Sequence, residues 1–292
     1  MTRARDFESC NPGGTVAHGA GCRSVWIRRI ATRAMLALLI CALGFVLWRA
    51  VRPSDSNSFS TAVGGHLEVT LPEGSVLQLN TATEVQTRIT PATREVHVIR
   101  GEVFFKVAHD TRPLTVMTAY ANVHTESWRA AGAVFDVRVR AHDSIDVSVT
   151  KGDVLVAAAY RTIGAMLRQT PVAELKASAG DAVHIRPEGL HVAQIGVAEI
   201  NRKLSWIEGL LVFQGETLVQ VADEFNRYNR RQLVIADPAI ASRRIGGAFQ
   251  ATDPDSFVAG LEKWFGIHAD EQSPTASGAG IVRLSRAQRQ RR

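Results

Sequence analysis

Histidine, cysteine and carboxylate side chains are the groups in this sequence that could hold a metal ion or catalyse a reaction. The nine histidines are scattered, and only His184 and His191 fall close together outside the apolar N-terminal stretch. They flank a turn at 187–189 and can face each other across a hairpin, but a metal site needs a third ligand that the spacing does not supply. We interpret both as surface histidines of strands and expect no metal site.

The three cysteines, Cys10, Cys22 and Cys41, all precede residue 50. The remaining chain therefore cannot contain a disulfide or a cysteine-based zinc or iron–sulfur site. The sequence also lacks a G-x-x-x-x-G-K-[ST] phosphate loop, a G-x-S-x-G nucleophile turn and an H-E-x-x-H helix. Carboxylates such as Glu102 and Asp110 have no spacing that singles them out as a catalytic pair. We expect neither an enzyme nor a bound cofactor.

The net charge of +6 and the isoelectric point near 9.6 raise the question of nucleic-acid binding. Many of the basic residues, however, lie at the two ends of the chain, and the interior is nearly balanced. No basic helix with interleaved aromatic residues is visible, and such a helix is one pattern of a nucleic-acid-binding surface. We therefore expect no nucleic-acid partner.

The elements that position these groups begin with an apolar stretch near the N-terminus. Residues 34–48 are uncharged, and the stretch 30–51 is long enough, at ~1.5 Å per residue, to cross a hydrocarbon layer of ~30 Å. Arg33 and Arg49 would lie near its two ends, and Trp26 and Trp48 suit the two interfaces. The sequence predicts a transmembrane helix over 30–51 behind a short basic segment, 1–29.

A secretory signal peptide is the alternative interpretation of this stretch, but Arg49 and Arg52 follow it at once and no convincing A-x-A site is present. The excess of arginine before the stretch predicts a cytoplasmic N-terminus in the inner membrane, with the bulk of the chain in the periplasm. The polar residues 52–60 predict a linker.

Residues 61–195 alternate apolar and polar side chains with glycines between the runs, which is typical of short strands with one buried face. In one such run, Phe135 and Val137 alternate with Asp136 and Arg138. Residues 157–170 break the pattern and suggest an inserted loop or short helix. The sequence predicts a mainly β domain here, followed by a linker over 196–205.

The pattern changes in residues 206–285, where strands and helices alternate. Thr217 is placed to cap a helix that ends near Tyr228, and Asp253 with Pro254 opens a second helix that Gly266 stops. Strands are predicted at 210–213, 233–236, 245–249, 267–269 and 281–284. We expect a small α+β domain with two β-α-β units sharing one sheet, followed by a basic tail, 286–292.

Several motifs in the β-rich segment occur in a fixed order. They are Leu71-Pro72-Glu73-Gly74-Ser75, Gly101-Glu102-Val103-Phe104-Phe105-Lys106-Val107, Arg112-Pro113-Leu114-Thr115-Val116 and Gly132-Ala133-Val134-Phe135-Asp136-Val137-Arg138. In this order they resemble the FecR family of envelope signalling proteins, which regulate iron-uptake genes.

The C-terminal part is similar to the short domain at the N-terminus of secretins and TonB-dependent transducers. The resemblance implies that Trp206, Leu211, Phe213, Arg227 and Tyr228 contact a partner. The same residues also have a structural interpretation. The large apolar side chains suit a core, and Arg227 suits a helix end.

The resemblance implies a single-pass inner-membrane signal transducer. It would relay the state of a TonB-dependent outer-membrane receptor, whose signalling domain is the expected partner, to an extracytoplasmic-function sigma factor. Because only about thirty residues precede the predicted anchor, we expect direct binding of the sigma factor to be weak or absent. The alternative function is a structural β-rich scaffold of the envelope.

Some members of the family cut their own chain at a Gly-Thr pair in the last of these motifs. The matching pair here is Gly132-Ala133, and a methyl group cannot attack the preceding carbonyl. We therefore expect an uncut chain.

Overall fold

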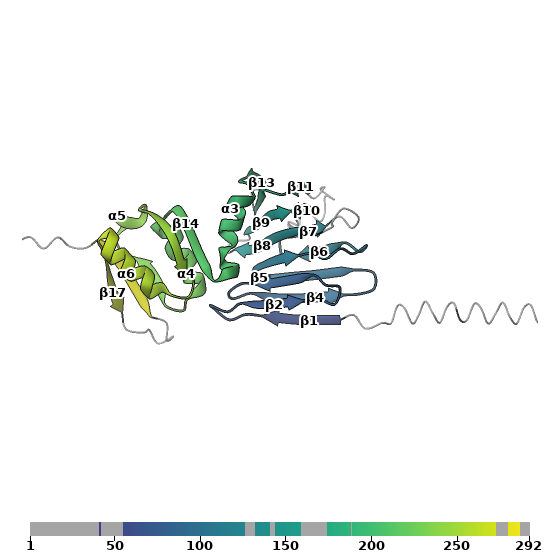
Figure 1. Ribbon diagram of the computed structural model, residues 1–292, viewed down its shortest axis with the longest axis horizontal. Coiled ribbons are helices and arrows are strands. Elements are labelled where there is room, and N and C mark those ends of the chain that lie inside the picture. Colours follow the sequence, from purple (N-terminus) through teal and green to yellow (C-terminus); the bar gives the residue numbers. More distant parts are fainter. Residues whose placement is uncertain are drawn as a thin grey trace, which may run out of the picture. The chain divides into compact units, whose positions relative to one another are not determined.

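The computed structural model describes residues 41, 55–125, 132–140, 144–158, 174–187, 189–272 and 280–286 (Figure 1). The chain divides into two units, Met1–Pro53 and Ser54–Arg292, and every element named below belongs to the second. None of the helices within these described ranges is long and apolar enough to cross a membrane. The predicted transmembrane helix over 30–51 lies outside the described residues except for Cys41, as does nearly all of the segment 157–170.

The N-terminal part of the second unit is a β region in which two sheets share one strand. The first sheet contains β1 (Asp55–Ser60), β4 (Glu84–Ile89), β5 (Arg94–Lys106), β6 (Leu114–Met117), β7 (Ala121–Thr125), β10 (Asp153–Ala158) and β11 (Glu174–Ser178). The second contains β2 (Leu67–Thr70), β3 (Val76–Leu79), β5, β8 (Val134–Arg140), β9 (Ser144–Lys151), β12 (Asp181–Arg186) and β13 (Gly189–Gln194). The mainly β prediction for this region is confirmed.

The long strand β5 joins the two sheets because it changes partners at Gly101. Before this glycine the strand pairs with β4 and β6, and after it with β3 and β8. Gly101 has a φ of 90°, and a Cβ atom there would lie 2.5 Å from the Cα of Thr83. The crossover therefore needs a residue without a side chain.

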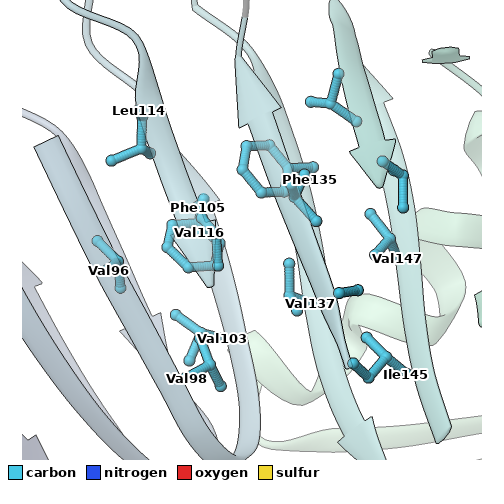
Figure 2. Close-up of a cluster of buried hydrophobic side chains, with 14 of the residues drawn as sticks. Val96, Val98, Val103, Phe105, Leu114, Val116, Phe135, Val137, Ile145 and Val147 are labelled. Carbon is cyan, nitrogen blue, oxygen red and sulfur yellow. The ribbon is translucent and has the colours of Figure 1, made fainter. Parts of the chain in front are cut away.

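The alternating apolar residues of both sheets form one continuous core (Figure 2). At its centre the rings of Phe105 and Phe135, on neighbouring strands, stack with centroids 5.0 Å apart. Val96 and Val98 come from the first half of β5, and Val147 comes from β9. This core is what the period-two pattern predicts.

The prediction of a linker over 52–60 is wrong for its described part. Residues 55–60 form β1, which pairs antiparallel with β4 along its whole length. The segment is polar because it is an edge strand, and only Phe59 packs against the core. Composition cannot distinguish such a strand from a stalk, since its stability comes from backbone pairing with a distant segment.

The predicted linker over 196–205 is also wrong. Residues Val197–Lys203 form helix α3, and Leu204–Glu208 continue as the 3-10 helix η1. Ile200, Leu204 and Trp206 are buried in the same cluster as the C-terminal core. The segment is thus an integral part of the C-terminal region.

The C-terminal region follows the predicted order of elements. It comprises β14 (Leu210–Thr217), α4 (Leu218–Tyr228), β15 (Gln232–Ile235), α5 (Pro238–Ala241), β16 (Arg244–Gln250), α6 (Pro254–Phe265), β17 (Ile267–Gln272) and β18 (Ile281–Arg286). Thr217 caps α4 with a complete capping box, Asp253 caps α6, and Gly266 ends α6 in the left-handed conformation.

The strands of this region form two sheets, whereas one sheet was expected. Among the described residues, strand β14 pairs only with β16, and β15 pairs with β18, which in turn pairs with β17. The core beneath them is rich in phenylalanine, with Phe225 stacked on Phe257 at 4.5 Å. The order of elements is a local property of the sequence, but the choice of strand partners is made by long-range packing.

Candidate functional site

The β region and the C-terminal region meet at the last turn of α4, where Arg227 lies between two carboxylates. Its guanidinium donates to Glu102 of β5 at 2.6 Å and to Glu224 of α4 at 2.5 Å. Burial lowers the pKa of Arg227, but the two carboxylates outweigh burial and raise it above its ordinary value. The arginine therefore stays charged and links strand β5 to helix α4.

Glu224 completes a second link between the regions. It accepts a bidentate pair of hydrogen bonds from Arg138 of β8, at 2.8 and 3.4 Å. Burial raises the pKa of Glu224, but Arg227 and Arg138 together overcome this effect and lower it to about 2. Below, the four residues Glu102, Arg138, Glu224 and Arg227 are called the clamp.

Neutral polar groups extend the clamp. The side-chain amide of Asn80 donates to Glu102 at 2.7 Å and to the hydroxyl of Tyr228 at 2.8 Å. The hydroxyl of Thr81 donates to the carbonyl of Arg227 at 3.0 Å. Gly64 lies against the same turn, because a Cβ atom there would be 2.9 Å from the carbonyl oxygen of Tyr228. The end of α4 is therefore held by three separate segments of the β region.

Apolar contacts accompany these polar ones. Phe104 of β5 belongs to the C-terminal core cluster, not to the core of its own region. The ring of His66 meets that of Trp206 edge-on, with centroids 5.8 Å apart. The contact between the regions thus has an apolar part beside the clamp, as stable interfaces do.

The five residues predicted to bind a partner all lie in or beside this contact. Trp206, Leu211, Phe213 and Tyr228 are between 4% and 8% exposed, and Arg227 is half-buried in the clamp. Leu211 and Phe213 lie on the face of β14 that packs on the C-terminal core. In this structure all five contact their own chain, as the structural interpretation of the sequence allowed, and their binding to a partner stays a prediction.

Asp136 of β8 is buried close to the clamp. Its Oδ1 atom has no hydrogen-bond partner among the described residues, and the residue as a whole is 5% exposed. Burial, reinforced by the charge of Glu102, raises the pKa of Asp136 well above its ordinary value. The alternation with Phe135 and Val137 predicts a solvent-facing Asp136, but the C-terminal region covers that face of the sheet.

A second group of charges surrounds Asp146 of β9. This carboxylate accepts from His184 at 2.8 Å and from Arg186 at 2.9 Å, and it also pairs with Arg140. Burial raises the pKa of Asp146, but Arg140 and His184 counteract it and lower the pKa to about 2. His184 also faces His191 across the β12–β13 hairpin, as predicted. The part of the chain that the structure describes has no group of three potential metal ligands.

A cleft of about 490 Å³ lies between these two groups of charges. Its walls come from β8 and β9, from α3, and from β14 and α4. The charged residues that line it include Asp136, Arg138, Asp146, Glu199, Arg202 and Glu224. Most of them already form ion pairs with one another. The walls of the cleft are therefore polar, but most of their charges are balanced by neighbouring charges of opposite sign.

The sequence analysis singled out Arg227 and Tyr228 as candidate partner-binding residues. It did not predict the clamp residues that contact them. Glu102 and Arg227 are 125 positions apart, and Arg138 and Glu224 are 86 apart. Two residues at such separations leave no local signal. The one usable hint is Phe104, which lies between inward-facing Val103 and Phe105 and is apolar where alternation predicts a polar residue.

Comparison with known proteins identifies the family to which the β region is similar. Residues 57–155 match the family model described as FecR protein. This segment is a FecR domain. The match begins within β1 and ends within β10, so it includes most of the first strand, for which the composition predicts a linker. The FecR resemblance of the sequence motifs is thereby confirmed.

Two crystal structures of a candidate anti-sigma factor from Parabacteroides distasonis are similar in fold. They have TM-scores of 0.59 and 0.60 and 21% identity, and each alignment covers 79% of this chain and 99% of that chain. The similarity therefore extends beyond the FecR domain. No curated protein matches the sequence.

Proposed function

We propose that this protein is an envelope signal transducer of the FecR type that regulates a sigma factor. The FecR domain is the observation that carries the proposal, and the fold shared with a candidate anti-sigma factor supports it. In the full form of the proposal the protein is a single-pass inner-membrane protein. Its exported part binds the signalling domain of a TonB-dependent outer-membrane receptor, and the signal controls genes of the iron-uptake type.

The clamp is the element through which we propose that the C-terminal region influences the FecR domain. It joins the helix α4 to strand β5 by a charged hydrogen bond of 2.6 Å and to strand β8 by one of 2.8 Å. Removing one partner of a buried ion pair leaves the other charge unpaired and costs ~3–5 kcal/mol. A partner that displaces α4 would therefore break these ion pairs and leave charges on β5 and β8 of the FecR domain unpaired.

A transcriptional reporter dependent on the sigma factor tests this function. In Arg227→Ala we expect signal-dependent induction to fall several-fold, because the two regions are uncoupled. Arg231→Ala is the matched control, since Arg231 also pairs with two acids, Asp255 and Glu271, within the C-terminal region. Unchanged induction in Arg227→Ala with a normal amount of folded protein would exclude the clamp as the relay. A reporter that does not respond to deletion of the gene, beside a defect in envelope integrity, would favour a scaffold.

The topology can be tested separately with reporter fusions. We expect alkaline phosphatase fused after Ser60 to be active, because the arginine bias predicts that residues after the apolar stretch are exported. A cytoplasmic reporter at the same position should be inactive. The reverse pattern would place the FecR domain in the cytoplasm and contradict the relay from an outer-membrane receptor.

A further inference from the structure

The edges of the two C-terminal sheets differ in how their backbone is protected. An unprotected edge strand offers free N–H and C=O groups to another strand, and proteins usually block such edges with side chains or charges. The region has four edges, formed by β14, β15, β16 and β17. Three of them are blocked.

Side chains close the edges of β14 and β15. On β14, Arg202 donates to the carbonyl of Val212 at 2.5 Å and Ser205 donates to that of Leu210 at 3.0 Å. On β15, the amide of Asn226 both accepts from the N–H of Leu233 and donates to its carbonyl, at 2.7 and 2.9 Å.

The edge of β17 is protected in two ways. The carboxylate of Glu262 accepts from the N–H of Ala269 at 3.2 Å. The strand also carries the exposed charged or titratable side chains of His268, Asp270 and Glu271.

Strand β16 has no such protection. Within the described residues, no side chain hydrogen-bonds to the backbone of Arg244–Gln250. The three central residues, Gly246, Gly247 and Ala248, are all exposed. The centre of the strand carries no charge and nearly no side chain, which leaves the backbone open to a partner strand.

The sequence of β16 is complementary to itself. The strand is Arg-Ile-Gly-Gly-Ala-Phe-Gln with Gly247 at its midpoint. If two copies pair antiparallel about Gly247, Ile245 faces Phe249 of the partner subunit and Gly246 faces Ala248 of the partner subunit. Arg244 then faces Gln250 of the partner subunit, so no like charges are opposed. An apolar pair of an aromatic and a β-branched residue is favourable in this position.

The register also keeps the two cores on one side. Ile245 and Phe249 are the inward-facing residues of the strand, with Ile245 1% exposed and Phe249 packed against the C-terminal core. Directly opposed residues of antiparallel strands point to the same face. Pairing about Gly247 therefore aligns the inward faces, whereas a shift by one residue would oppose an inward face to an outward one.

We propose that the occupant of this edge is a second copy of the same chain, and that β16 pairs with itself across a two-fold axis at Gly247. The result is a four-stranded sheet in the order β14, β16, then β16 and β14 of the second copy. The interface is isologous, as in most homodimers.

Cysteine cross-linking in the full-length protein tests the pairing. Two differently tagged chains, one with Gly246→Cys and one with Ala248→Cys, are expressed together, with Cys10, Cys22 and Cys41 replaced by serine. Opposed residues have Cβ atoms ~5 Å apart, whereas like residues lie diagonally at ~7–8 Å, beyond easy disulfide geometry. We expect a disulfide-linked product that contains both tags, at least about fivefold more than with either variant alone. A mixed pair on β17, His268→Cys and Asp270→Cys, is the matched control.

Equilibrium sedimentation of the full chain in detergent gives the second measurement. The double variant Gly246→Lys with Ala248→Lys opposes lysines across the axis at exposed positions. We therefore expect the dissociation constant of the dimer to rise at least about tenfold, without a change in thermal unfolding. A mixed cysteine sample that cross-links no more than the β17 control would overturn the proposal. So would a chain that stays monomeric while the lysine variant loses binding to a receptor signalling domain, because the edge would then belong to that partner.

Discussion

At the scale of single residues, the structure depends on Gly101 for steric reasons. Its φ of 90° costs a residue with a side chain ~1–2 kcal/mol, and the added Cβ would also overlap Thr83, whose Oγ1 would be 2.2 Å away. We predict that Gly101→Ala destabilises the protein by about 3 kcal/mol or more in urea unfolding. Gly215 has a similar φ of 104° but open space around it, so Gly215→Ala should cost only ~1–2 kcal/mol. Equal effects would show that the close approach of β5 to Thr83 does not constrain the fold.

Asp136 gives a prediction about pH. Burial raises the pKa of this carboxyl in the folded protein, so folding takes up a proton once the pH exceeds the ordinary value near 4. The contribution of the protonated carboxyl to the free energy of unfolding is complete below that pH. It is lost as the pH rises through the folded pKa, by about 1.4 kcal/mol per pH unit. Asp136→Asn should therefore gain stability relative to the wild type as pH rises above 4.

Chemical unfolding at several pH values measures this difference. Asp223→Asn is the control, because Asp223 lines the same cleft but is exposed on α4. If the difference between Asp136→Asn and the wild type does not change with pH, Asp136 is ionised in the folded protein.

At the scale of elements, the sequence predicts what is decided locally. The start of α4 is an example, because Thr217 and Gln220 form a capping box within one turn. We predict that Thr217→Ala costs about 1 kcal/mol in thermal or urea unfolding, since it removes an acceptor for the first turn. Thr217→Ser keeps the hydroxyl and should lie within a few tenths of a kcal/mol of the wild type. A loss equally large in both variants would point to the methyl group instead of the cap.

The elements that sequence reasoning missed are those that distant segments stabilise. Strand β1 is polar and is recognisable only by its pairing with β4, some thirty residues away. Helix α3 follows Gly196 without a side-chain cap, so no local signal marks its start. Its buried Ile200 and Leu204, the first residue of η1, have the spacing of one helical face, but two residues are too few for periodicity to decide.

At the scale of the whole molecule, the same limit applies to the contact between the regions. The alternation of β8 predicts a sheet with one wet face, and that prediction fails at Asp136 because the C-terminal region covers the face. The clamp residues come from β5, β8 and α4, and no pattern in the sequence connects them. Family resemblance identified the FecR domain, but the contact itself follows only from the folded chain.

The integrity of the whole chain is the last prediction. Self-cleavage by an N-to-O acyl shift requires a hydroxyl on the residue after Gly132, which attacks the glycine carbonyl carbon. The peptide nitrogen then leaves as an amine, and water hydrolyses the resulting ester. Residue 133 is an alanine, 1% exposed, directly before β8, and its methyl group has no electron pair to donate. We therefore expect one full-length band when purified protein with a tag at each end is examined by immunoblot.

Ala133→Ser is the variant that restores the nucleophile with little added volume, and Ala133→Val adds volume without a hydroxyl. Two fragments with a break after Gly132 in the unaltered protein, free of proteases, would contradict the prediction.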